Sequence, residues 1–183
     1  MKKQGSYKTN CPVSYKDLKI VVVDYLDFDN NIKKGSLIVH KKISKKVQMI
    51  FDELLKIGYN IERIEPIYNY QADDYISIKH NNSSAFNCRK IATTNKWSNH
   101  AYGLAIDINP LQNPFVSKDG KVTHKGSVNY IQRHKNKKTL HDKAMIDKDS
   151  HVVKIFQKYG FKWGGNWKSV KDYQHFEHPK FYK

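Results

Sequence analysis

Two short segments, far apart in the chain, each place a histidine close to a carboxylate. The first contains His100 and Asp107, separated by small residues and an apolar run. In the second, Asp172 stands three residues before His175. Imidazole and carboxylate groups are the usual ligands of a catalytic zinc, which takes three protein side chains and keeps a fourth position for water. If His100, Asp107 and His175 bind one ion, the fold must bring both segments together. Asp172 would then lie beside the water as a general base.

Length and composition predict a single domain with its own hydrophobic core. The chain has 183 residues, of which 39% are hydrophobic, and this argues against disorder. We expect residues 1–16 to be a tail or irregular lead-in and residues 17–183 to be one domain. No apolar run approaches the length of a membrane span. We expect a monomer without a membrane span.

The basic composition indicates an anionic partner. Lys and Arg exceed Asp and Glu by 33 − 17 = 16 charges, and such a field attracts nucleic acid, anionic lipid or cell-wall polymers. Most of these charges are lysines spread over every segment, as on a generally solvated surface. No helix-turn-helix, zinc-finger or RNA-recognition pattern occurs, so we expect no nucleic-acid partner.

The N-terminus is polar and lacks the apolar core of a signal peptide. We expect a location in the periplasm or cell wall if a signal peptide has been removed, and otherwise a phage-derived or cytoplasmic protein. Cys11 and Cys88 do not have the CxxC spacing of a zinc site, and the sequence leaves open whether they form a disulfide.

Hydrophobic periodicity predicts a mixture of helices and strands. The clearest helix follows Ser44 as its N-cap and ends at Gly58, and a second follows Asp149 or Ser150 and ends at Gly160. Strands are expected over residues 18–28 and 35–40, which form a hairpin, and over residues 61–68, 86–91 and 103–108. A loop or broken helix is expected over residues 69–84, and a long functional or disordered loop over residues 109–141.

The two histidine segments form the motifs Ser98-x-His100-x-x-Gly103-x-Ala105-x-Asp107 and Asp172-x-x-His175. Together they resemble the zinc peptidases that cut bacterial cell-wall stem peptides, among them D-alanyl-D-alanine carboxypeptidases and L-alanyl-D-glutamate endopeptidases. Residues 84–89, 108–114 and 161–167 strengthen the resemblance to a carboxypeptidase-like branch. It implies one zinc ion per chain and a single α+β domain of the Hedgehog/DD-peptidase type, with a mostly antiparallel sheet flanked by helices.

The resemblance also implies roles for individual residues. The acidic residue three positions before the last ligand, Asp172, would be the general base. Glu177 is the rival, because it shares strand parity with His175. Arg89 would hold the substrate carbonyl or carboxylate, and Ser84 would add a hydrogen bond to substrate.

Several other residues have a structural interpretation. Gly103 would let the backbone bend or approach another segment closely. The role of three aromatic residues, Tyr102, Trp163 and Trp167, as cleft lining or core packing is left open. Six further histidines are interpreted only as surface or core residues: His40, His80, His124, His134, His141 and His151.

These features favour a zinc peptidase that hydrolyses peptidoglycan stem peptides. A D-Ala-D-Ala carboxypeptidase is favoured over an L-Ala-D-Glu endopeptidase, because Arg89 offers a partner for a terminal carboxylate. The alternative from another class is a basic cell-wall or nucleic-acid binding protein in which the histidines are structural. It predicts salt-sensitive polyanion binding and no activity that a chelator removes.

Overall fold

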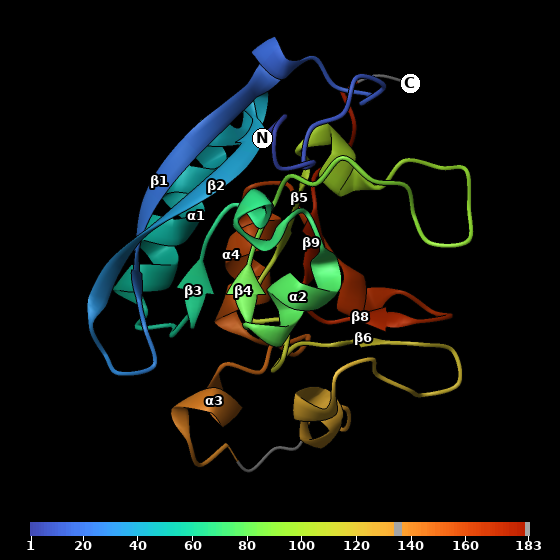
Figure 1. Cartoon of the computed structure of the whole chain (residues 1–183). Helices are drawn as coiled ribbons and strands as arrows, with labels where there is room; N and C mark the ends of the chain where they lie inside the picture. The colour runs from blue at the N-terminus through green and yellow to red at the C-terminus, as the bar shows by residue number, and fades with distance from the viewer. Residues whose placement is uncertain (134–136, 182–183) are drawn as a thin grey trace.

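A long antiparallel hairpin forms one side of the molecule (Figure 1). In the computed structural model, which describes residues 1–133 and 137–181, β1 (Leu18–Leu26) pairs with β2 (Ile32–His40). Alternate residues of β1, such as Val21 and Val23, are buried, as a half-buried strand requires. The predicted hairpin is confirmed, and its second strand begins three residues earlier than expected.

Helix α1 (Ser44–Lys56) packs against the hairpin and buries Val47, Ile50, Phe51 and Leu54. This confirms the helix that the three-to-four spacing predicts. Its expected N-cap is wrong, because a 3-10 turn, η2 (Lys41–Ile43), runs directly into the helix. Ser44 is therefore already helical, and its hydroxyl donates to the carbonyl of Lys41 at 2.9 Å.

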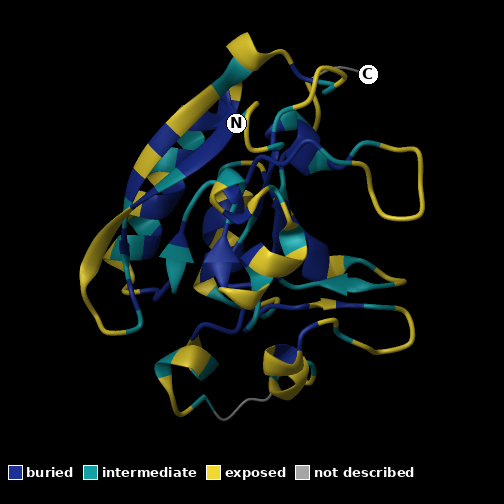
Figure 2. Cartoon of the chain, in the orientation of Figure 1, coloured by how far each residue is buried: buried dark blue, intermediate teal, exposed yellow. Residues whose placement is uncertain are grey.

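A three-stranded antiparallel sheet crosses the centre of the molecule in the order β5 (Ala105–Asp107), β9 (His175–Glu177) and β7 (Lys162–Trp163). Helix α4 (His151–Lys158), capped by Ser150, packs against it. The rings of Phe156 on α4 and Phe176 on β9 stack with their centroids 3.8 Å apart. Figure 2 shows these central elements as the most deeply buried part of the chain.

The remaining strands are two residues long. β3 (Arg63–Ile64) pairs with β4 (Asn82–Ser83) in parallel, and β6 (Phe115–Val116) pairs with β8 (Lys171–Asp172) in antiparallel orientation. Two short helices complete the fold: α2 (Asp74–Lys79), which Asp73 caps, and α3 (Leu140–Lys143). The predicted α+β class is confirmed, with the strands divided among four small sheets.

Three predicted segments differ from the structure. Of the strand expected over residues 61–68, only β3 forms, and a 3-10 turn, η3 (Ile67–Tyr70), follows it. The strand expected over residues 86–91 is absent, because its N–H groups bond to separate segments: Phe86 to Ile38 and Cys88 to Ser6. The long segment over residues 109–141 contains β6 and η5 (Lys125–Tyr130), while residues 134–136, including His134, lie outside the described residues.

The N-terminal segment is tied to the rest of the chain. Cys11 and Cys88 form a disulfide, which settles the pairing that the sequence left open. Ser6 and Val13 are buried. The division between a lead-in over residues 1–16 and one domain over residues 17–183 stays a prediction. Among the described residues, no helix has the length and apolar character needed to span a bilayer.

Candidate metal centre

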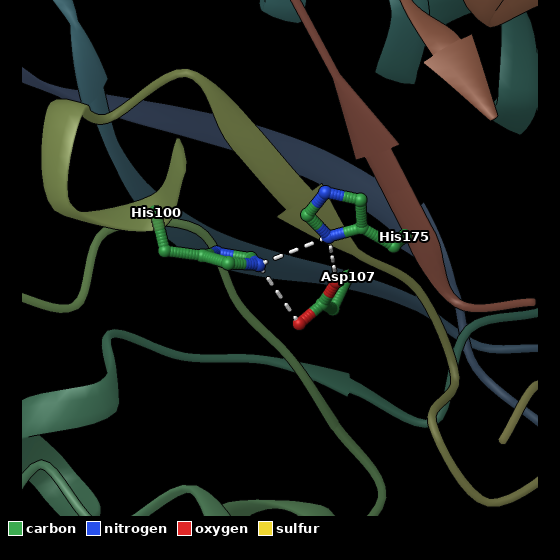
Figure 3. Close-up of side chains that lie close together, drawn as sticks. All are labelled: His100, Asp107 and His175. Carbon is green, nitrogen blue, oxygen red and sulfur yellow. Dashed lines mark hydrogen bonds and ion pairs between the residues drawn. The ribbon is translucent and has the colours of Figure 1, made fainter. Parts of the chain in front are cut away.

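Strand pairing brings the two histidine segments together. Asp107, the last residue of β5, lies directly opposite His175, the first residue of β9. His100 belongs to a 3-10 turn, η4 (Asn99–Tyr102), that precedes β5, and the hydroxyl of Ser98 caps this turn by accepting from the His100 N–H. The three predicted ligands therefore come from three adjoining elements and point toward one another (Figure 3).

Gly103 makes the connection between η4 and β5 possible. Its φ of +66° lies in the left-handed region, and a Cβ atom there would be 2.6 Å from the backbone nitrogen of His40. That nitrogen donates to the Gly103 carbonyl at 2.8 Å. Both features expected of this glycine, the turn and the close approach, are present, and any larger residue would be strained.

The three side chains have the spacing of ligands around one small cation. His100 Nε2 is 3.2 Å from His175 Nδ1 and 3.2 Å from Asp107 Oδ2, and His175 Nδ1 is 3.1 Å from Asp107 Oδ1. Tetrahedral ligands at about 2.0–2.1 Å from a zinc ion are about 3.3 Å from one another. The donor set and its spacing therefore fit zinc. It is the one group of this kind among the described residues.

The outer nitrogen of each imidazole is held by a neighbour. His100 Nδ1 lies 2.5 Å from the carbonyl oxygen of Ala85, and His175 Nε2 lies 3.2 Å from Glu177 Oε2. Asn99 donates to the same Glu177 oxygen at 2.5 Å. Such contacts fix the tautomer and the orientation of metal-binding histidines. They leave His100 Nε2 and His175 Nδ1 to face Asp107.

The electrostatics of the cluster show strong mutual attraction. Burial alone would raise the pKa of Asp107, but the charge of His100 and hydrogen bonds from both imidazoles lower it well below its usual range. Burial alone would lower the pKa of His175, but its bonds to Asp107 and Glu177 raise it to about 10. The cluster therefore favours a positive charge beside the carboxylate of Asp107, where a cation would bind.

A comparison with protein-family models matches residues 92–178 to a family described as D-alanyl-D-alanine carboxypeptidase. These residues are similar to that family, and they make up just under half of the chain. The match confirms the resemblance seen in the two motifs, and it includes all three residues of the cluster together with Asp172. No solved structure matches the chain.

Within the matched residues, Asp172 lies close enough to the cluster to be affected by its charges. Burial and the charge of Asp107 raise the pKa of Asp172 to about 6, while His175 and His100 oppose the rise. Its Oδ1 atom is inaccessible to water and has no hydrogen-bond partner among the described residues. A carboxylate with such a pKa suits a base working near neutral pH. Its catalytic role stays a prediction.

Glu177, the rival base, has a different environment. Its contact with His175 confirms that the two side chains share one face of β9, as strand parity indicates. The bond from His175 lowers the pKa of Glu177 more than burial raises it. Because Glu177 lies on the outer nitrogen of the imidazole, its place suits holding a ligand rather than accepting protons from water.

A narrow cleft adjoins the cluster and contains the two predicted substrate-binding residues. Asp107, Ser84 and Arg89 all line it. The backbone of Ser84 exchanges two hydrogen bonds with that of Asp107, at 2.8 and 3.1 Å. Arg89 forms an ion pair with Asp74 of α2, and about a third of each side chain is exposed. A cation is thus held at the edge of the cleft, while the binding roles stay predictions.

The aromatic residues have separate positions. Trp163 is buried and donates to the carbonyl of Tyr173 at 2.8 Å, as a core residue does. The ring of Trp167 lies 5.3 Å from that of His175, beside the cluster. Tyr102 packs partly against the core. Sequence reasoning missed Gln174, a buried cleft residue whose only signal is its position between Asp172 and His175.

Proposed function

We propose that the chain is a zinc-dependent peptidase that hydrolyses peptidoglycan stem peptides, with a fold of the Hedgehog/DD-peptidase type. The observation that carries this proposal is the convergence of His100 Nε2, an Asp107 oxygen and His175 Nδ1 at the spacing of tetrahedral ligands. The carboxypeptidase family match supports the same reaction class. These three residues would hold one zinc ion. Such an ion activates water and polarises the scissile carbonyl.

In this proposal, Asp172 accepts a proton at its carboxylate from the attacking water and passes it to the departing amine. The raised pKa of about 6 supports both transfers, because the carboxylate is charged at neutral pH yet holds a proton readily. Its proximity to the cluster supports this role, because a general base must reach the attacked water. Glu177 keeps the His175 ring in the orientation that ligation needs.

Arg89 binds the carboxylate or carbonyl of the substrate at the edge of the cleft, and Ser84 adds a hydrogen bond. A terminal carboxylate is the stronger partner for a guanidinium, so we propose a D-Ala-D-Ala carboxypeptidase, with the L-Ala-D-Glu endopeptidase as the alternative. The Cys11–Cys88 disulfide supports an extracytoplasmic location, because disulfides persist in oxidising compartments.

The experiment that tests this proposal combines metal content with hydrolysis of a synthetic muropeptide pentapeptide, its products identified by mass. We expect one zinc per chain in the wild type and in Asp172→Ala, but not in His175→Ala, and loss of hydrolysis in both variants. His151→Ala, which changes an exposed histidine of α4, is the matched control and should keep metal and activity.

The products decide between the two bonds. Release of terminal D-Ala establishes the carboxypeptidase, and release of a longer peptide establishes the endopeptidase. A wild type without metal or hydrolysis that binds cell walls or nucleic acid in a salt-sensitive manner would contradict the peptidase and support the binding protein.

A further inference from the structure

A second cavity adjoins the cleft of the candidate metal centre, and both α2 and β6 contribute residues to its lining. It has a volume of about 200 Å³ and shares four lining residues with the cleft: Asp74, Ile78, Pro110 and Gln174. An apolar cavity of about 150 Å³ already holds a molecule the size of benzene. The cavity is thus large enough for a side chain much longer than the methyl group of alanine.

Most of the cavity wall is apolar. Aliphatic and proline side chains form much of it, among them Ile78, Pro110, Pro114 and Val122. The aromatic rings of Tyr75 and Phe115 lie at its edge and are about half exposed. Such a wall favours a long aliphatic side chain, whose burial removes apolar surface from water.

Two buried polar atoms in this wall have no hydrogen-bond partner among the described residues, His124 Nε2 and Gln174 Oε1. The side chain of Gln174 donates to Asp172, so its amide oxygen is left as an acceptor. His124 is 9% exposed and its ring stacks on Tyr75 with the centroids 4.3 Å apart. Buried polar groups normally have partners, so both atoms indicate a ligand that supplies hydrogen-bond donors.

The lining of the cavity lacks the positively charged side chains that dominate the rest of the chain. The chain carries a net charge of +16, yet the described residues that line the cavity include no Lys or Arg. They include one acidic residue, Asp74. Arg89 and Asn87 each contact Asp74 from the side of the cleft. Burial lowers the pKa of His124, which keeps its ring neutral. Arg89 offsets the charge of Asp74, so a cationic group with several donors meets mainly the neutral acceptors of Gln174 and His124 here.

We propose that this cavity is the subsite for a substrate side chain that has an aliphatic stem and a terminal ammonium group. The inference rests on the proposed function, because within a stem peptide this chemistry belongs to the diamino acid. Gln174 Oε1 and His124 Nε2 are inaccessible to water in the structure, so the ammonium donates to them once the two side chains rotate toward the cavity. The stem packs on the apolar wall. Lysine fits better than diaminopimelate, whose extra carboxylate would face Asp74.

The test measures binding of three peptides that differ only at the diamino acid: lysine, norleucine and diaminopimelate. Calorimetry with the zinc-loaded Asp172→Ala variant reports binding without hydrolysis. We expect the lysine peptide to bind at least about tenfold more tightly than the norleucine peptide, since a hydrogen bond to a charged group contributes that much. The diaminopimelate peptide should bind more weakly than the lysine peptide.

Substitutions in the cavity test which residues cause the preference for the lysine peptide. His124→Leu should reduce the lysine preference to about threefold or less, whereas His151→Leu, at an exposed position of α4, should keep it. Val122→Trp, at a partly exposed loop position, should fill the cavity and weaken binding of the lysine and norleucine peptides alike. Retained secondary structure by circular dichroism confirms that each variant is folded.

Equal binding of the lysine and norleucine peptides, or an unchanged preference in His124→Leu, would overturn the subsite. These outcomes are independent of the proposed function. If the wild type hydrolyses all three peptides equally well and binding is equal, the peptidase stands and the subsite fails. If it hydrolyses none but binds the lysine peptide best, the subsite stands and the peptidase fails.

Discussion

Glu177 directly fixes the orientation of one proposed metal ligand, His175. Its carboxylate holds His175 Nε2 and itself accepts from Asn99. We expect Glu177→Ala to weaken zinc binding by about 10–100-fold, because the imidazole then loses its fixed orientation and basicity. Glu177→Gln keeps an acceptor oxygen and should lose less. Competition with a chromogenic chelator measures both affinities, and equal values for Ala, Gln and wild type would contradict this role.

Asp172 should reduce the stability of the metal-free protein above about pH 6. Its usual pKa of 3.8 is raised to about 6 in the fold, so the native state keeps a proton that the unfolded state releases between these values. The free energy of unfolding contributed by this group therefore falls as pH rises through that window. Full conversion of the shift gives about 3 kcal/mol, and the partial exposure of Asp172 reduces this to about 1–2 kcal/mol.

Asp172→Asn removes this effect because its neutral amide has no proton to lose. Urea unfolding in the presence of a chelator should show the variant more stable by about 1–2 kcal/mol at pH 8 and equal to the wild type near pH 4. Asp149→Asn, at an exposed position, should change stability little at either pH. A gain for Asp172→Asn that is the same at both pH values would contradict the raised pKa.

Sequence reasoning identified the candidate ligands because their types and local spacing are visible without the fold. His100 and Asp107 are separated by one turn and one strand, and His175 faces Asp107 through strand pairing. Gln174 and Asp74 could not be found in this way. Their contribution to the cleft depends on α2 lying beside β8 and β9, which no spacing within either segment reveals.

At the scale of elements, long amphipathic segments were predictable and short ones were not. Helix α1 and the β1–β2 hairpin repeat their apolar residues over several turns or alternations, so the period can be measured. Strands of two or three residues, such as β3 and β7, contain no complete period. Residues 86–91 place Phe86 and Cys88 at alternate buried positions, as a strand would, but the backbone N–H groups of these two residues bond to separate segments.

Arg133 should fix the position of residues 117–133, the described part of the segment after β6. Arg133 donates to the carbonyl of Gln112, to Asn113 Oδ1 at 2.7 Å and to the carbonyl of Ile146 at 2.6 Å. Its guanidinium also lies 4.6 Å from the ring centroid of Tyr173. Burial lowers the pKa of Arg133 to about 10, so the group stays charged at neutral pH.

We therefore expect Arg133→Met to lower the free energy of unfolding by about 2–4 kcal/mol, because the carbonyls of Gln112 and Ile146 lose this donor. Lys125→Met, at an exposed position of the same segment, should change stability by about 0.5 kcal/mol or less. Urea unfolding measures both. Equal losses in the two variants would show that Arg133 does not hold this segment.

At the scale of the whole molecule, the N-terminal half provides much of the supporting core and the C-terminal half contains all three residues of the cluster. The main core joins buried residues of the hairpin and α1 to those of α4, β5 and β9, including Phe51, Phe156 and Phe176. A separate small core contains Val13, Ile38, Phe86 and Cys88. It lies under the N-terminal segment, so the first residues of the chain contribute to the support of the cleft segment that carries Ser84.

The disulfide should matter more for stability than its place near the N-terminus suggests. Cys11 and Cys88 are 77 residues apart in sequence and 5.8 Å apart between their Cα atoms. A cross-link over so long a loop restricts the unfolded chain strongly and contributes about 2–4 kcal/mol. The double variant Cys11→Ser, Cys88→Ala should lose about this amount in urea unfolding.

Reduction provides the matched control for that loss, because it breaks the bond without changing the sequence. A thiol reductant should lower the stability of the wild type by nearly as much as the double substitution and leave the double variant unchanged. Cys88 is fully buried but Cys11 is partly exposed, so the reductant is expected to attack the bond at the sulfur of Cys11. A reductant effect of equal size in both proteins would show that the cross-link does not stabilise the fold.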